Sequence, residues 1–346
     1  MKVDALTLRQ AGDGDKRLSS VAPPLLILLG AAGAMALLPL VLGPYGLRVA
    51  TTACMYLALA QSWNLIGGYA GLVSLAHPAF IGTGAVAAAI CLINGLPIAV
   101  AVVVALALSL AIALLVGTPT LRLQGHYFVV ATLLVSEALR NFVLNVDAFG
   151  FQGGVSVNIV SHVGISALGS DAYNRFFYHL MLGLAVAAMA VVLAFDRSRW
   201  GLALRTIRDN EAAAAALGVA AARLKLAVFL ISAGMASLIG TASAFWIGTI
   251  ETNDAYSLVI TFEVIVMVFL GGRGTLWGPA IGVGFVLLLN EMIGVEFAEV
   301  TQVVSGLIVV LIVLFLPDGL MAALTEGPKA LSWQRLRENV RRYRVS

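Results

Sequence analysis

Apolar segments long enough to cross a lipid bilayer follow one another along almost the whole sequence. A membrane-spanning helix needs about 20 mostly apolar residues, with a range of about 17 to 25. Only 11% of the 346 residues are charged, whereas a soluble domain carries about 25%. The sequence therefore predicts an all-α, polytopic membrane helix bundle of about ten transmembrane helices. The candidate segments lie near 22–43, 47–66, 72–95, 97–117, 126–145, 177–195, 226–248, 257–271, 279–294 and 302–317.

The basic residues predict how these segments are oriented. Sixteen of the 21 Lys and Arg residues fall in 1–21, 196–225 and 319–346. These regions are separated by six and then four segments, and cytoplasmic loops carry an excess of Lys and Arg. Because both numbers are even, one topology places all three regions, and thus both termini, in the cytoplasm.

This topology divides the chain into three parts. We expect a cytoplasmic N-terminal tail over 1–21, a transmembrane domain over 22–318 and a basic amphipathic tail over 319–346 that lies on membrane lipid. The transmembrane domain contains the cytoplasmic loop 196–225 and the longest outer loop, 146–176.

The sequence lacks the motifs of nucleic-acid-binding proteins, ATPases, metalloenzymes and serine hydrolases. The net charge of +3 is explained by the topology, and no aromatic–basic module indicates a nucleic-acid partner. The motif GxxxxGK[ST] is absent, so any ATP hydrolysis belongs to a partner chain. Cys54 and Cys91 lie in apolar segments, and neither HExxH nor GxSxG occurs. We therefore expect no catalytic residue, no metal site and no cofactor.

Five residues inside the apolar segments are candidates for a translocation path or gate. Ionisable groups in spans are costly and are functional hypotheses by default. Glu137 and Arg140 are three residues apart, so they can form a structural ion pair or part of a gate. Glu263 has no nearby cation in sequence, and it either lines a path or has a partner on another helix. Pro78 is expected to kink the third segment beside a hydrogen-bonded His77, with direct substrate contact as the alternative.

The stretch RTIRDNEAAAAALGVAAARLKL at 205–226 is too charged to cross a bilayer yet strongly favours a helix. Asp209 or Asn210 can cap that helix, and Glu211 suits its positive end. Gly218 interrupts it about two turns later. The alanines either give this helix a smooth face on which another protein docks, or the helix is a simple connector that lies on the membrane.

Two glycine-rich stretches, starting at Gly67 and Gly271, resemble each other as GGYAGLVSLAHPAFIGTGA and GGRGTLWGPAIGVGF. In the second, Gly274, Gly278 and Gly282 lie four residues apart, a spacing that lets helix backbones approach closely in lipid. We expect helix packing here, and an unwound backbone along a path is the alternative.

Several stretches in combination resemble the LivM-type permeases of branched-chain amino-acid ABC importers. The resemblance covers about 47–320. It is carried by SWNLIGGYAGLVSLAHPAFIGTGA (62–85), LRLQGHYFVVATLLVSEALR (121–140), GLALRTIRDNEAAAAALGV (201–219), FEVIVMVFLGGRGTLWGPAIG (262–282) and FLPDGL (315–320).

The resemblance implies a type II–like importer permease in the inner membrane of a bacterium or archaeon. Its partners would be a second homologous permease, two ATP-binding subunits and an extracytoplasmic substrate-binding protein. The family's E-A-A-x4-G coupling helix would fall within 209–220. The matching residues, with the arginines that precede them, are Arg205, Arg208, Glu211, Ala212, Ala213 and Gly218.

For the binding protein, the family's outer-loop T-G-G-x-x-G is reduced here to Gln152-Gly153-Gly154. We include these three residues as candidates for that contact, together with Glu251 and Asp254 in the next outer loop.

The expected function is passage of branched-chain or other small amino acids through the membrane, energised by the partner ATPases. Urea, short amides and sugars are alternative substrates. An ion-coupled secondary transporter is the alternative of a different class, and it would take up substrate without ATPase partners.

Overall fold

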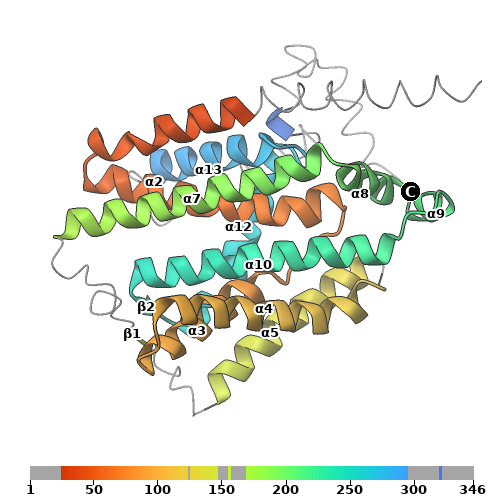
Figure 1. Ribbon diagram of the computed structural model, residues 1–346, viewed down its shortest axis with the longest axis horizontal. Helices are drawn as coiled ribbons and strands as arrows, with labels where there is room; N and C mark the ends of the chain where they lie inside the picture. The colour runs from red at the N-terminus through yellow and green to blue at the C-terminus, as the bar shows by residue number, and fades with distance from the viewer. Residues whose placement is uncertain (1–24, 124, 147–154, 157–168, 295–318, 322–346) are drawn as a thin grey trace, which may run out of the picture.

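The structure, a computed structural model, describes residues 25–123, 125–146, 155–156, 169–294 and 319–321. They form a bundle of helices that run roughly along one direction in two groups (Figure 1). The first apolar helix is Leu25–Leu40, whose last turn is the 3-10 helix η1, Leu38–Leu40. The other elements are α2 (Pro44–Trp63), the π-helix η2 (Asn64–Tyr69), α3 (His77–Ile93), α4 (Ile98–Thr120), α5 (His126–Asn145), β1 (Val155–Ser156), α7 (Ser170–Asp196), α8 (Arg199–Asp209), α9 (Glu211–Ala216), α10 (Ala221–Ile247), β2 (Thr249–Ile250), α11 (Thr252–Ala255), α12 (Leu258–Gly271) and α13 (Gly278–Gly294).

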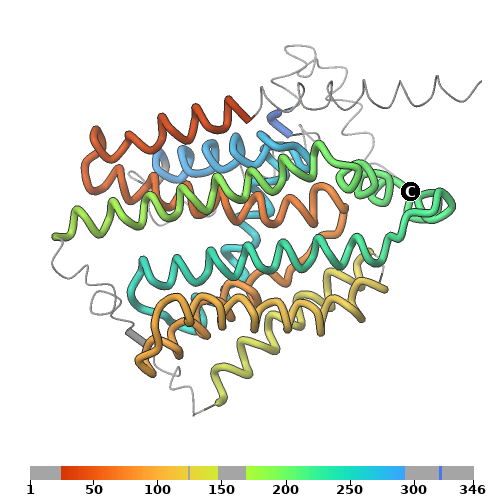
Figure 2. The backbone as a smooth tube through the Cα atoms, in the orientation of Figure 1, coloured from red at the N-terminus to blue at the C-terminus, as the bar shows by residue number. Residues whose placement is uncertain are grey.

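Helix α10 joins the two groups of helices. It packs on α3 and α4 in one group and on α2 and α7 in the other, where α12 pairs with α13 (Figure 2). Helices α8 and α9 project at one end of the bundle, which we call the α8–α9 end (Figure 1). The two short strands lie at the other end, which we call the β1–β2 end.

The predicted apolar segments correspond to helices wherever the structure describes them. Each of the first nine overlaps one helix, while 302–317 lies outside the described residues, as do 1–21 and most of the C-terminal tail. Within the described part, five helices are long and apolar enough to cross a membrane, and the number of about ten spans stays a prediction. These five are Ile98–Thr120, His126–Asn145, Ser170–Asp196, Ala221–Ile247 and Thr252–Gly271.

The small residues of the third segment allow α3 to lie directly against α10. A Cβ atom placed on Gly84 would come 2.3 Å from the carbonyl oxygen of Ser237, and one on Gly240 would come 2.3 Å from that of Ile81. Glycine at both positions therefore lets the two backbones touch, as small residues do between helices in lipid.

Helices α12 and α13 also approach through glycine, as the four-residue spacing predicts. A Cβ atom on Gly271 or Gly282 would come 1.8 Å from the carbonyl oxygen of Gly278 or Met267, respectively. Gly274 was expected in the same helical stripe, but it lies in the turn between the helices with a φ of +72°. Gly274 therefore belongs to the turn, whereas Gly278 and Gly282 belong to the contact between α12 and α13.

The third segment begins as a helix only at His77, five residues later than predicted. The preceding chain forms η2 over Asn64–Tyr69 and is not helical over 70–76. The expected kink at Pro78 is wrong, because this proline lies in the first turn of α3, where a missing amide proton and a fixed φ are tolerated.

The loop predicted over 146–176 is shorter than expected, since α7 already starts at Ser170. Val155 in its described strand pairs with Ile250, which connects this loop to the one after α10.

Candidate functional site

Helix α8 follows α7 at one end of the bundle and leads into the predicted coupling segment. The Ser198 hydroxyl caps its start by accepting a hydrogen bond from the amide of Gly201 at 3.2 Å. Gly201, Leu204 and Ile207, spaced three apart, are buried, so one face of α8 is fixed against the bundle.

The stretch 205–226 contains the end of α8, all of α9 and the start of α10, with breaks at the cap and at the glycine that the sequence marks. Asn210, and not Asp209, caps α9 by accepting from the amide of Ala213 at 3.0 Å. Gly218 ends α9 with a φ of +82°, a left-handed conformation that favours glycine. Asn210 therefore separates α8 from α9, and Gly218 separates α9 from α10. The chain changes direction at each of these two residues.

One face of α9 is fixed and the other is open. Ala214 is fully buried, and the Glu211 carboxylate lies 2.6 Å from the ammonium group of Lys225, which is 5% exposed. Ala212 and Ala213 are exposed, as are the alanines that follow Ala214. The helix therefore presents a small apolar surface in a defined orientation.

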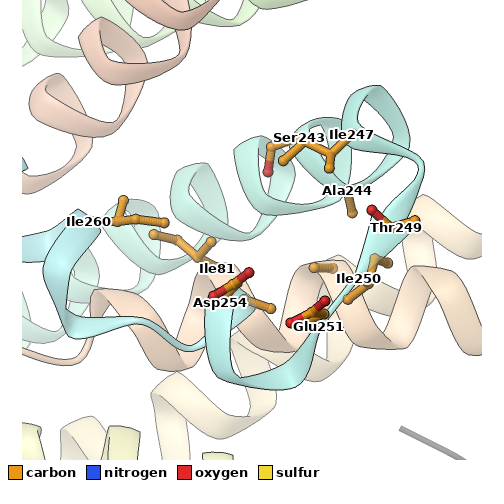
Figure 3. A pocket seen from close by; sticks show the side chains of 11 residues that line it. Ile81, Ser243, Ala244, Ile247, Thr249, Ile250, Glu251, Asp254 and Ile260 are labelled. Carbon is orange, nitrogen blue, oxygen red and sulfur yellow. The ribbon is translucent and has the colours of Figure 1, made fainter. Parts of the chain in front are cut away.

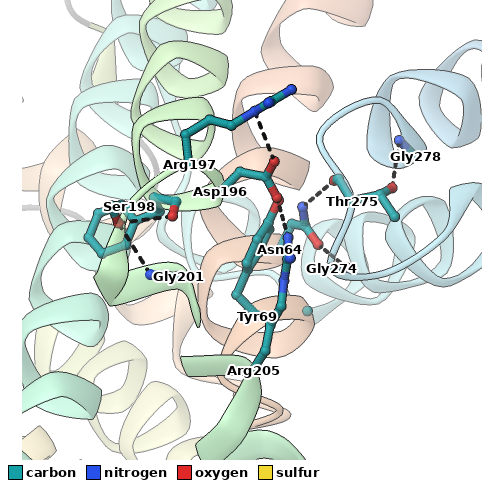
Figure 4. Close-up of polar contacts among 12 residues, drawn as sticks. Asn64, Tyr69, Asp196, Arg197, Ser198, Gly201, Arg205, Gly274, Thr275 and Gly278 are labelled. Carbon is teal, nitrogen blue, oxygen red and sulfur yellow. Dashed lines mark hydrogen bonds and ion pairs between the residues drawn. The ribbon is translucent and has the colours of Figure 1, made fainter. Parts of the chain in front are cut away.

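Arg205 and Tyr69 meet at Asp196, the last residue of α7 (Figure 4). Both donate hydrogen bonds to the same carboxylate oxygen, Tyr69 at 2.9 Å, and the guanidinium carbon of Arg205 lies 5.3 Å from the Tyr69 ring centre. Burial, together with the negative charge of Asp196, raises the pKa of the Tyr69 hydroxyl above its ordinary value. The cluster holds α8 against α7 and η2.

Arg208 reaches from α8 to the backbone of η2. Its Nη1 donates to the Gly68 carbonyl at 3.0 Å. In the same place the Asn64 side chain accepts from the amide of Gly274 at 2.8 Å and donates to the carbonyl of Thr275 at 2.9 Å (Figure 4). The two glycine-rich stretches that resemble each other in sequence therefore meet, and Asn64, which the sequence did not single out, joins them.

His77 lies at the centre of the described bundle, between α2, α3 and α10. Its Nε2 is 3.2 Å from the hydroxyls of both Ser62 and Ser232. Each hydroxyl gives its proton to the other serine's carbonyl at 2.8 Å, so both are acceptors toward His77 and the ring proton belongs on Nε2. Nδ1 is buried without a partner among the described residues.

The non-helical segment before His77 obtains its hydrogen bonds from side chains of α5 and α2. The Leu75 amide donates to the Thr132 hydroxyl at 3.0 Å, and its carbonyl accepts from Ser136 at 2.8 Å. The Trp63 indole donates to the Ser74 carbonyl at 2.9 Å. Irregular backbone inside a membrane protein is tolerated only where its polar groups are satisfied in this way.

The charged candidates within the helices each have a partner. Glu137 and Arg140 form the expected ion pair at 2.7 Å, and Arg140 also donates to the Asn253 side chain at 3.1 Å. Glu263 accepts a hydrogen bond from Tyr56 on α2. A partner on another helix is thus the better of its two interpretations.

A hollow of about 170 Å³ opens at the β1–β2 end, between α3, α10 and α12 (Figure 3). Glu251 and Asp254 extend into it from the chain that follows α10. The other candidates for the binding-protein contact, Gln152, Gly153 and Gly154, lie outside the described residues. The rest of the lining is Ile81, Ala85, Ser243, Ala244, Ile247, Thr249, Ile250, Ala255 and Ile260.

The described residues contain no group of three or more His, Cys, Asp or Glu side chains able to hold a metal ion.

Known proteins similar to this chain are permeases. The chain is 27% identical over 297 residues to the high-affinity branched-chain amino acid transport system permease protein LivM of Salmonella typhimurium, which covers 79% of this chain and 69% of that protein. It is 25% identical over 220 residues to the probable branched-chain amino acid transport permease LivM of Methanocaldococcus jannaschii, covering 59% and 62%. It is 28% identical over 138 residues to the LivH permease of the corresponding Escherichia coli system, covering 39% and 44%.

No solved structure matches the chain significantly. The model of the family described as branched-chain amino acid transport system / permease component matches residues 45–313, which run from the second residue of α2 past the end of α13. With its apolar helices, this match shows a multi-pass membrane protein. The chain belongs to the permease components of the branched-chain amino acid transport systems.

Proposed function

We propose that this chain is a permease subunit of an ATP-driven importer for branched-chain or other small amino acids. It would reside in the inner membrane of a bacterium or archaeon, with the α8–α9 end in the cytoplasm. A second permease, two ATP-binding subunits and an extracytoplasmic binding protein would complete the complex. Similarity to proteins named LivM and LivH, both permeases of branched-chain amino acid systems, supports the substrate class and a paired permease.

The observation that carries the proposal is the exposed alanine face of α9. A helix of six residues is too short to be stable by itself in water. Here a side-chain cap at Asn210 and the Glu211–Lys225 ion pair hold it in place, so its open face is ready for contact before any partner arrives. Residues 209–220, including Ala212, Ala213 and Gly218, would receive the ATPase subunits.

The translocation path would run beside α3. His77 with Ser62 and Ser232 would close it in the described conformation, because their hydrogen bonds join three helices at one level. Pro78, in the first turn of α3, would fix the start of that helix next to His77. The Glu137–Arg140 pair and Glu263 would act as supports for the moving helices.

At the β1–β2 end, Glu251 and Asp254 would contact the binding protein that delivers the substrate. Among the described residues neither carboxylate has a cationic partner, so both remain available to basic groups of another protein.

A bulky residue on the α9 face tests this proposal. In the complete complex reconstituted into vesicles, Ala213→Trp is expected to lower ATP-driven leucine uptake about tenfold or more, because it obstructs a closely packed docking surface. Leu123→Trp is the matched control, since Leu123 is exposed in the turn after α4 at the same end of the bundle. Full ATP-driven uptake by the Ala213→Trp complex would contradict the docking role. Leucine uptake by this chain alone, driven by a proton or sodium gradient, would instead establish a secondary carrier.

A further inference from the structure

The side chain of Arg208 lies in a slot made by three glycines, Gly68, Gly71 and Gly274. A Cβ atom on Gly71 would come 2.5 Å from Cγ of Arg208, and one on Gly274 would come 2.8 Å from its Nη1. The third glycine supplies the carbonyl that accepts from Nη1 at 3.0 Å. We call Gly68, Gly71 and Gly274 the glycine slot, because a larger residue at Gly71 or Gly274 would displace the arginine, and Gly68 supplies the carbonyl that it binds.

The walls of the glycine slot belong to two separate parts of the bundle. Gly68 and Gly71 lie in and just after η2, whereas Gly274 lies in the turn between α12 and α13. The two walls touch, since a Cβ atom on Gly68 would come 2.5 Å from the Gly274 amide. Hydrogen bonds from Asn64 and from Gln61, which donates to the Leu276 carbonyl at 2.7 Å, hold them together.

The element that supplies the carbonyl bound by the arginine is the π-helix η2. A π-helix is a rare and wider turn that frequently occurs at functional sites. Here η2 continues α2 directly and leads through the non-helical 70–76 segment to His77. A displacement of η2 therefore reaches both the end of α2 and the start of α3.

The two arginines of the segment before α9 have different surroundings. Arg205 binds Asp196 at the end of α7 and lies over the ring of Tyr69 in η2. Arg208 pairs through Nε with its neighbour Asp209 and also reaches both glycine-rich stretches, at the Gly68 carbonyl and beside Gly274.

We propose that Arg208, seated in the glycine slot, is a positioning residue that transmits a movement of α8 and α9 to α2, α3 and the α12–α13 pair. The inference rests on the proposed function, in which partner ATPases move α9. It assigns Arg208 to transmission inside this chain, and the docking of the ATPase subunits to the exposed face of α9.

The test is the stoichiometry of transport in the complete reconstituted complex. For Arg208→Ala we expect the ATPase subunits to co-purify at wild-type levels, while leucine uptake per ATP hydrolysed falls about tenfold or more, the effect of losing a hydrogen bond made by a charged group. Arg208→Lys, which keeps a cationic donor, should recover part of the loss. Arg223→Ala removes an exposed arginine from the first turn of α10 and should leave the ratio unchanged.

A second substitution tests the slot itself. Gly71→Ala should also lower uptake per ATP, because its new methyl group displaces Cγ of Arg208 and the φ of +73° at this position disfavours alanine. In the Gly71→Ala/Arg208→Ala double variant the two losses should not multiply, since both changes remove the same contact.

Three results would overturn the inference while leaving the proposed function intact. They are loss of the ATPase subunits from Arg208→Ala, an unchanged uptake ratio in that variant, and fully multiplied losses in the double variant. The wild-type complex is measured first, and failure of its ATP-driven uptake would reject the proposed function and this inference with it.

Discussion

Lys225 is a charged residue buried in the first turns of α10, with its ammonium group against Glu211. Removing the partner of a buried charge costs more than removing the charge itself, because the remaining ion stays out of water without compensation. Glu211 is 44% exposed, so solvent weakens the pair but does not replace it.

This asymmetry gives a stability prediction. Glu211→Gln should lower the free energy of unfolding by about 1–2 kcal/mol, below the range for a fully buried pair because of the exposed carboxylate. Lys225→Met should cost less, since the freed carboxylate can be hydrated. Thermal unfolding of the purified protein in detergent measures both, and an equal or larger loss in Lys225→Met would contradict the assignment of burial.

At the residue scale, the sequence predicts contacts between near neighbours and misses distant ones. The Glu137–Arg140 pair follows from helix geometry, because residues three apart share a face. The Tyr56–Glu263 contact joins residues 207 positions apart, and no local rule connects them. The role of Asn64, which joins η2 to the 272–277 turn, follows only from the structure, because the sequence does not show that these two segments are in contact.

Between elements, the approach of α3 to α10 depends on glycines that contact backbone. Gly84 and Gly240 each face a carbonyl oxygen of the opposite helix. Such contacts cannot adjust as a flexible side chain can, so the helices themselves must move apart if a methyl group is added.

Gly84→Ala should therefore destabilise the protein by about 1–3 kcal/mol, the usual cost of overpacking. Gly183→Ala on α7 is the matched control, because a Cβ atom there has nothing within 4 Å. Relief of the glycine backbone entropy should make this control neutral or up to about 1 kcal/mol more stable. Unfolding followed by tryptophan fluorescence distinguishes them, and equal effects at both sites would exclude close helix contact as the cause.

The existence of the helices is predictable from apolar length, while their boundaries are not. Both ends of α9 are set by Asn210 and Gly218, which the sequence marks as cap and interruption, yet helix propensity alone favours one continuous helix. The late start of α3 depends on hydrogen bonds from side chains of α5, and these cannot be predicted from the sequence of the third segment alone.

For the molecule as a whole, the two ends of the bundle should face opposite sides of the membrane. In whole cells, a membrane-impermeant thiol reagent should label Thr249→Cys at the β1–β2 end. Ala213→Cys on α9 should react only after permeabilisation, as should the control Leu123→Cys. All three positions are exposed, and the native Cys54 and Cys91 are buried. Labelling of Ala213→Cys in intact cells would reverse the predicted orientation.

At this scale the sequence predicts the family and the succession of apolar helices, because both depend on patterns spread over most of the chain. The meeting of the two glycine-rich stretches around Arg208 was not predictable, since their likeness in sequence does not imply contact in space.

The non-helical segment before α3 also has a consequence for biosynthesis. The backbone groups of Leu75 bind Thr132 and Ser136, which lie 57 and 61 residues further along the chain. While the ribosome is still adding α4, these backbone groups have no such hydroxyl to bind inside the lipid. We therefore expect α3 of the nascent chain to reach its final position only after α5 has been made and inserted beside it.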